Sequence, residues 1–212
     1  MNKNRYKHAQ ELPLRMKSAH PKTIDTFSKH IQAQLNKHHG SKIILCIGTD
    51  RSTGDALGPL TGMLLEAQSL QHFEVYGTID NPVHATNLIA YLEYIKQTYE
   101  NPFIIAIDAS LGRQESIGYL TCGIGAIQPG AAFQKALPAV GDIHLTGVVN
   151  VSGHMGFEKL QSTRLALVYQ MATVLSDTLS QVDRILYPIQ EQPNVLWWQK
   201  FMFWRTKKDL LS

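Results

Sequence analysis

The sequence is poor in cysteine, and its 212 residues include only Cys46 and Cys122. Both lie in apolar segments that resemble strands, so we predict no disulfide framework and a reducing, cytoplasmic setting. No segment approaches the roughly 20 consecutive apolar residues that a transmembrane helix needs. The first ten residues, MNKNRYKHAQ, lack the apolar stretch of a secretory signal. The composition therefore favours a water-soluble protein without a membrane span.

Charge is also sparse: charged residues make up 17% of the chain, and the net charge is +3. The first 42 residues, however, contain nine Lys and Arg residues against Glu11 and Asp25. We predict that residues 1–20 form a basic, flexible leader and that residues 21–212 form a single domain. No DNA- or RNA-binding motif accompanies the basic residues, which argues against a nucleic-acid partner.

The hydrophobic pattern alternates between strands and helices. Strands are expected at 42–48, 73–79 and 102–108, and helices at 24–35, 60–70 and 84–99. Two further strands, 116–123 and 144–151, and a long helix over 157–180 complete the chain. This alternation predicts an α/β fold whose sheet is mostly parallel, with right-handed crossovers.

Two aspartates follow strands of this predicted sheet. Asp55 lies in the segment CIGTDRSTGDALGP after the first strand, and Asp108 ends the strand PFIIAID. Because ligands bind outside the carboxyl ends of parallel strands, we expect the two side chains to share one crevice. Paired carboxyl groups can perform acid–base chemistry on a water, one ionised and the other protonated. Helix or turn capping by either aspartate is the alternative.

A metal site is a further alternative for the same crevice, because carboxylate oxygens bind divalent cations. Three histidines, His84, His144 and His154, are near enough to the predicted strand ends to approach it. Zinc-type spacing of cysteine and histidine is absent. The glycines of the loop match neither G-x-G-x-x-G nor a Walker loop, which excludes the common phosphate-binding motifs.

Several motifs together resemble the YyaC-type sporulation proteins of endospore-forming bacteria. They are IGTDRSTGDALGPLTG, IDASLGR, IQPGAA and VGDIHLTGVVNVSG. That family is similar to two peptidase families, the spore germination protease and the hydrogenase maturation proteases. The resemblance implies their fold, a three-layer α/β sandwich of the phosphorylase/hydrolase-like type with a mostly parallel sheet.

The resemblance also implies roles for individual residues. The D-A-L-G-P and I-D-A stretches match those of the germination protease, whose catalytic aspartates correspond to Asp55 and Asp108. Hydrogenase maturation proteases bind nickel through a glutamate, an aspartate and a histidine. Their glutamate corresponds to Asp55, and His144 is the nearest match to their histidine, so Asp55, Asp108 and His144 are the candidate ligands for a divalent metal ion.

The sequence thus predicts a sporulation-associated peptidase of the cytoplasm of a forespore or mother cell. Asp55 and Asp108 would activate a water to hydrolyse a protein or peptide substrate. Four loop residues, Asp50, Arg51, Ser52 and Thr53, would line the mouth and position the substrate backbone. The alternative is a non-enzymatic spore protein that binds a peptide, DNA or a membrane surface, the last two through its basic leader or tryptophan-rich tail. A homo-oligomer is compatible with either function.

Overall fold

The structure, a computed structural model, describes residues 12–130 and 137–186. Its strands are β1 (Leu14–Lys17), β2 (Lys42–Cys46), β3 (Phe73–Tyr76), β4 (Phe103–Gly112), β5 (Tyr119–Ile124) and β6 (Ile143–Val151). Its α-helices are α1 (Thr23–Leu35), α2 (Leu57–Ala67), α3 (Leu88–Thr98), α4 (Gly156–Gln161) and α5 (Leu165–Leu186). Short 3-10 helices, η1 (Gly54–Ala56) and η2 (Gln114–Ser116), precede α2 and β5.

The strands form one sheet in the order β1-β5-β6-β4-β2-β3. Strands β3, β2, β4 and β6 run parallel to one another, whereas β5 is antiparallel to both of its neighbours, β6 and β1. The mostly parallel sheet predicted from the sequence is therefore confirmed. The antiparallel part arises where β4 continues into β5 without a crossover helix, through the short connection that contains η2.

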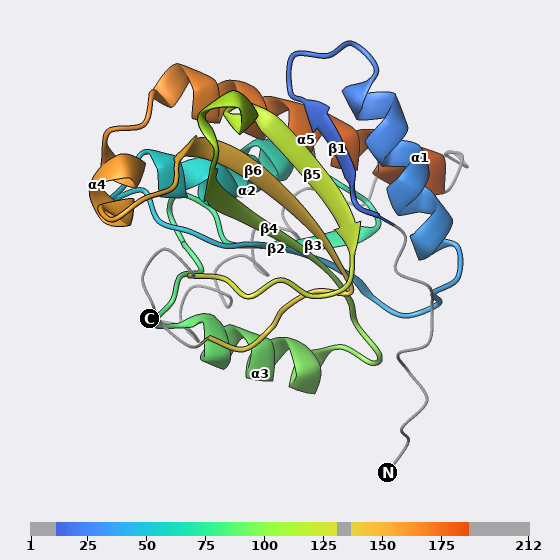
Figure 1. The fold of residues 1–212 in the computed structure, drawn as a ribbon. Helices are drawn as coiled ribbons and strands as arrows, with labels where there is room; N and C mark the ends of the chain where they lie inside the picture. Colours follow the sequence, from blue (N-terminus) through green and yellow to red (C-terminus); the bar gives the residue numbers. More distant parts are fainter. Residues whose placement is uncertain (1–11, 131–136, 187–212) are drawn as a thin grey trace.

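Helices cover both faces of the sheet, which confirms the three-layer arrangement (Figure 1). Helices α1, α2 and α5 pack on one face, and α3 packs on the other. Strand β2 shows how the sequence supports two cores: Ile44 and Cys46 face the first group of helices, while Ile43 and Leu45 face α3. A strand buried on both faces needs an uninterrupted apolar run, and β2 has one.

The N-terminal part corrects one prediction. Residues 14–17, predicted to belong to a flexible leader, form strand β1, in which Leu14 pairs with Cys122 of β5. Leu14 and Met16 pack against the core, and Arg15 lies over the ring of Tyr119, 4.9 Å from its centroid. The alternation of apolar and charged residues is that of a half-buried strand. Residues 1–11 and 187–212, including the tryptophan-rich tail, lie outside the described residues, and the single domain over 21–212 stays a prediction.

The predicted long helix over 157–180 is in fact two helices, α4 and α5, separated at residues 162–164. The hydroxyl of Thr163 donates to the carbonyl oxygen of Lys159 at 2.8 Å and accepts from the side-chain amide of Asn150 at 3.2 Å. Serine and threonine side chains compete with helical hydrogen bonds in this way, and here they accompany the break.

No helix within residues 12–130 and 137–186 combines the length and the apolar character of a membrane span.

Helix α2 lies unusually close to the end of β2, and glycine makes this possible. A Cβ atom on Gly58 would overlap the carbonyl oxygen of Ile47 and lie 2.7 Å from its nitrogen. Both groups are backbone, so no side-chain rotamer can relieve the contact. Gly58 therefore sets the distance between the first turn of α2 and the strand that it follows.

We predict that Gly58→Ala destabilises the protein. Alanine favours a helix over glycine by about 1 kcal/mol, but overpacking against backbone costs about 1–3 kcal/mol or more, so the clash should dominate. Thermal unfolding should show a midpoint lower by about 2–8 °C. Gly153→Ala is the matched control, because nothing lies within 4 Å of the Cβ that it adds. Equal midpoints for the two variants would contradict the prediction.

Candidate active site

The candidate site lies where the connections of the sheet diverge. After β2 the chain passes through α2 on one face to β3, and after β3 it passes through α3 on the other face to β4. Strands β2 and β4 are nevertheless neighbours. The two connections therefore separate above the carboxyl ends of this strand pair, which is where open α/β sheets bind ligands.

Asp55 reaches this point because the loop after β2 folds back over the strand. Gly48 has φ +143°, a conformation that side chains disfavour, and a Cβ there would overlap the carbonyl oxygen of Asp55. The same carbonyl oxygen accepts a hydrogen bond from the backbone N–H of Thr49 at 3.2 Å. The loop is thus closed across its base, with Asp55 in η1 immediately before α2.

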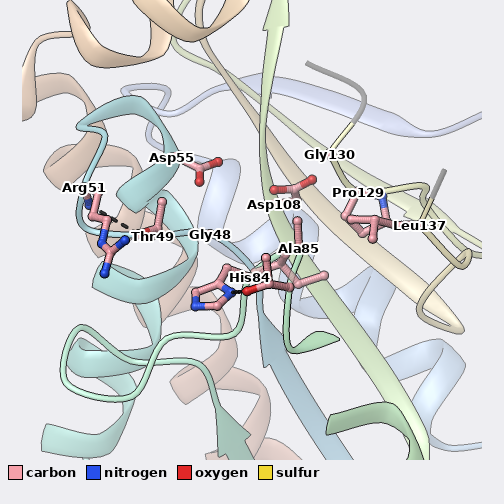
Figure 2. A pocket seen from close by; sticks show the side chains of 12 residues that line it. Gly48, Thr49, Arg51, Asp55, His84, Ala85, Asp108, Pro129, Gly130 and Leu137 are labelled. Atoms are coloured by element: carbon pink, nitrogen blue, oxygen red, sulfur yellow. Dashed lines mark hydrogen bonds between the residues drawn. The ribbon is translucent and has the colours of Figure 1, made fainter. Parts of the chain in front are cut away.

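Asp108 comes from the adjacent strand. Cys46, the last residue of β2, is paired with Ile107, so Asp108 is the first residue of β4 beyond the end of β2. Its Oδ1 accepts a hydrogen bond from the backbone N–H of Ala109 at 2.9 Å. In Figure 2 the carboxyl groups of Asp55 and Asp108 point toward one another. The structure therefore brings together the two aspartates that the sequence singled out.

The two carboxyl groups hold protons more tightly than ordinary aspartates. Burial raises the pKa of Asp55 from 3.8 to about 6, although the backbone N–H of Thr49, which favours the charged carboxyl group, lowers it in part. Burial also raises the pKa of Asp108 well above 3.8, and repulsion from Asp55 raises it further. Because both groups are buried and Asp55 repels Asp108, the pair favours a state with one shared proton over a state with two negative charges.

A pocket of about 240 Å³ opens beside the pair. Its lining comes from four separate segments: Ile47, Gly48, Thr49, Arg51 and Asp55; His84, Ala85 and Thr86; Asp108; and Pro129, Gly130 and Leu137. Pro129 and Gly130 belong to the IQPG motif, which the structure thus connects with the site. Apolar groups and polar side chains both line the pocket, as in most sites for organic ligands.

Only one of the four residues predicted to line the mouth does so. Arg51 lines the pocket, whereas Asp50, Ser52 and Thr53 do not. The backbone N–H of Ala56 donates to the carbonyl oxygen of Ser52 at 3.0 Å, as in a helical turn. Arg51 and Asp55 both line the pocket, although their side chains extend in different directions (Figure 2). Ser52 is only 2% exposed.

His144 does not join the two aspartates in the pocket. It lies on β6 opposite Ala106, two residues before Thr146, the partner of Asp108. Its Nδ1 donates to the carbonyl oxygen of Gly125 at 2.9 Å. Across residues 12–130 and 137–186, no group of three or more His, Cys, Asp or Glu side chains is arranged to hold a metal ion. The predicted ligand set of Asp55, Asp108 and His144 is therefore not assembled.

The histidine that lines the pocket is His84, one of the three that the sequence places near the strand ends but not the one predicted to join the aspartates. It follows Val83, which forms a parallel bridge to Ile47 and accepts a hydrogen bond from the N–H of Gly48 at 2.8 Å. This bridge continues the pairing of β2 beyond β3. His84 thus lies at a third strand-like end of the same sheet edge. The sequence indicated this position only weakly, because residues 80–82, Asp-Asn-Pro, separate the predicted strand 73–79 from Val83.

Comparison with known proteins identifies the family. The family described as "Protein of unknown function (DUF1256)" matches residues 15–178. The chain belongs to this family. Every residue that lines the pocket falls within the matched range of the DUF1256 family.

A curated relative supports the same assignment. The "Uncharacterized protein YyaC" of Bacillus subtilis (strain 168) is 52% identical over 155 residues, which cover 73% of this chain and 76% of the relative. The resemblance to YyaC-type proteins is thereby confirmed.

Two solved structures were also found to be similar to this DUF1256 protein. The [NiFe] hydrogenase maturation protease HycI from Thermococcus kodakarensis KOD1 has 14% identity and a TM-score of 0.49, over 73% of this chain and 99% of that chain. The Hydrogenase 3 Maturation protease has 17% identity and a TM-score of 0.36, over 66% and 87% of the two chains.

We predict that Asp108→Asn stabilises this DUF1256 protein at neutral pH. A carboxyl group whose pKa is raised by folding contributes most stability below its unfolded pKa, and that contribution is lost as pH rises toward the folded pKa. Asparagine does not titrate and still accepts from Ala109. At pH 7 the free energy of unfolding should therefore increase, because asparagine carries no charge for burial and Asp55 to destabilise.

Denaturant titrations at pH 7 and pH 3.5 test this prediction. The stabilisation should be largest at pH 7 and should nearly vanish at pH 3.5, where aspartate is mostly protonated in both states. Asp80→Asn, at an exposed aspartate outside the pocket, is the matched control. A gain that is the same at both pH values would show that burial does not raise the pKa of Asp108.

Proposed function

We propose that this DUF1256 protein is a peptidase in which Asp55 and Asp108 activate a water for hydrolysis of a peptide bond. The observation that carries the proposal is the placement of two buried, facing carboxyl groups beside an open pocket. Acid–base catalysis requires one ionised and one protonated partner, and two neighbouring buried carboxyl groups favour that state because both cannot readily carry a charge.

In the proposed reaction Asp55 is the base and Asp108 the acid. Asp55 accepts a proton from the water as its oxygen attacks the carbonyl carbon, while Asp108 donates its proton to the carbonyl oxygen. In the second step the carbon–nitrogen bond breaks, Asp55 delivers its proton to the departing nitrogen, and Asp108 recovers its own. The sum is one water consumed and one peptide bond cleaved, with both aspartates returned to their starting states.

Arg51 is available to bind the substrate. Its side chain is exposed at the pocket, and among residues 12–130 and 137–186 the single salt bridge joins Arg113 and Glu115. Its charge is also absent from the causes that set the pKa of Asp55. A guanidinium has five N–H donors, so Arg51 can hold backbone carbonyl groups of a peptide lying across the pocket.

The cellular setting that we propose is the cytoplasm of a forespore or mother cell, with a spore protein as substrate. The motif resemblance to the germination protease supports this setting, as does the close relative from Bacillus subtilis. A non-enzymatic peptide-binding protein that uses the same pocket is the alternative.

We predict that Asp55→Asn and Asp108→Asn each reduce the rate of peptide cleavage at least about 100-fold, the usual contribution of an acid–base group. The full chain and each variant are incubated with a peptide library, and new termini are identified by mass spectrometry. Asp80→Asn is the matched control and should cleave like the wild type.

Three outcomes distinguish the proposals. Unchanged cleavage by both pocket variants would remove the pair from the mechanism. Peptides retained but not cleaved by the wild type and both variants would support a binding protein. EDTA should leave the rate unchanged; a loss that a divalent ion restores would assign a metal to the site instead.

We predict that kcat/KM for a cleaved peptide rises with pH through an apparent pKa of about 6, the value to which burial raises Asp55. Below this pH Asp55 is protonated and cannot accept a proton, so the rate should fall about tenfold for each further drop of one in pH. At higher pH the rate should fall again once Asp108 loses its proton. A rise centred near pH 4 would mean that Asp55 has the pKa of a solvated aspartate.

A further inference from the structure

The pocket also contains the imidazole of His84, which the aspartate mechanism leaves without a role. His84 lies on the connection between β3 and α3, across from the strand ends that carry the aspartates. Burial raises the pKa values of Asp55 and Asp108, repulsion from Asp55 raises that of Asp108 further, and backbone hydrogen bonds lower both; His84 is not among these causes. The imidazole lines the same pocket as the two aspartates, so it can contact a ligand that binds there.

The backbone around His84 is fixed by Asn87. The N–H of His84 donates to Oδ1 of Asn87 at 2.8 Å, and the side-chain amide of Asn87 donates to the carbonyl oxygen of Pro82 at 3.0 Å. The carbonyl oxygen of His84 accepts from the N–H of Leu88 at 2.9 Å, at the first turn of α3. A side chain on such a segment is preorganised, which reduces the entropy that binding must supply.

The ring itself is fixed by Thr86. Nδ1 of His84 lies 2.9 Å from Oγ1 of Thr86, and Nε2 is on the opposite side of the ring (Figure 2). Nε2 has no hydrogen-bond partner within residues 12–130 and 137–186, and it is not among the buried atoms without partners. The ring thus has one nitrogen engaged and the other accessible.

We propose that Thr86 donates its hydroxyl proton to Nδ1, and that His84 in consequence keeps its proton on Nε2 and donates it to a backbone carbonyl oxygen of the peptide substrate. His84 is then a positioning residue that sets where the peptide lies relative to Asp55 and Asp108. This inference rests on the proposed peptidase function for the identity of its ligand. The tautomer of His84 can be tested independently of that function.

Nitrogen-15 NMR of the full chain tests the tautomer first. Protonated and unprotonated imidazole nitrogens have well separated 15N shifts, and the His84 signals are assigned by their loss in His84→Gln. At a pH where the ring is neutral, the wild type should show Nε2 protonated and Nδ1 unprotonated. Thr86→Val, isosteric at an exposed position, should give a mixture of tautomers. A wild-type ring protonated on Nδ1 would overturn the proposal.

Steady-state kinetics on a cleaved library peptide test the contact. His84→Ala should raise KM about threefold to tenfold, the range expected for one neutral hydrogen bond, and should change kcat little. His84→Gln, whose amide nitrogen can reach the place of Nε2, should restore most of the affinity, whereas His84→Asn should not. Thr86→Val should raise KM in the same direction. His39→Ala, at an exposed histidine outside the pocket, is the matched control.

The outcomes separate the two proposals. If the aspartate variants lose cleavage but His84→Ala retains the wild-type KM, the peptidase function stands and the role of His84 is wrong. If the wild type cleaves no peptide, the peptidase function fails, and the peptide library is titrated onto the 15N-labelled protein. A shift of His84 Nε2 that Thr86→Val weakens would then support peptide binding by His84, and no shift would overturn it.

Discussion

The structure depends on one unfavourable arrangement: two carboxyl groups that repel each other in a poorly hydrated space. Isolated aspartates would separate or remain in water, so the surrounding fold must hold them together at some cost in free energy. The parallel register of β2 and β4 supplies the constraint, because it places Asp108 directly beyond the strand that leads to Asp55. Buried apolar residues on both faces of these strands make that register hard to change.

The two walls of the pocket are built differently. The side of the pocket that carries Asp55 is held by close contacts between backbone atoms, at Gly48 and at Gly58. The wall of His84 depends on side-chain hydrogen bonds: Tyr91 donates from its hydroxyl to Oδ1 of Asn81 at 3.0 Å, and Asn81 in turn accepts from and donates to Thr78. Helix α3 therefore supports the segment that leads to His84 as well as covering the sheet.

The sequence predicts the central strands and the aspartate pair well, and the reasons are local. An apolar run such as that of β2 identifies a strand buried on both faces, and a residue at its carboxyl end is placed at a known edge. Strand β1 was not predicted because its alternation of apolar and charged residues spans only four residues and lies in a basic region. Whether His84 or His144 lies near the aspartates depends on the order of the strands in the sheet. The hydrophobic pattern of the sequence does not give that order.

Substrate binding by the loop after β2 stays a prediction, and of its four residues only Arg51 lines the pocket. Four consecutive polar residues, 50–53, are equally suited to the mouth by their composition. A helical turn already begins at Ser52, whose side chain is buried, whereas Arg51 precedes this turn and lines the pocket. The boundary between loop and helix decides which side chains reach the pocket. Sequence patterns locate such boundaries only to within a few residues.

The contact of Gly58 with Ile47 bears on how the family can diverge. This contact joins backbone atoms to backbone atoms and contains no side chain that could change its rotamer. It therefore cannot adjust when the volume of side chains elsewhere in the core changes. Substitutions that enlarge or shrink the layer between α2 and α5 must be accommodated by movement of the outer turns, away from this junction. Evolutionary drift in that layer can therefore reshape the exterior of the molecule while the entrance to the aspartates keeps its dimensions.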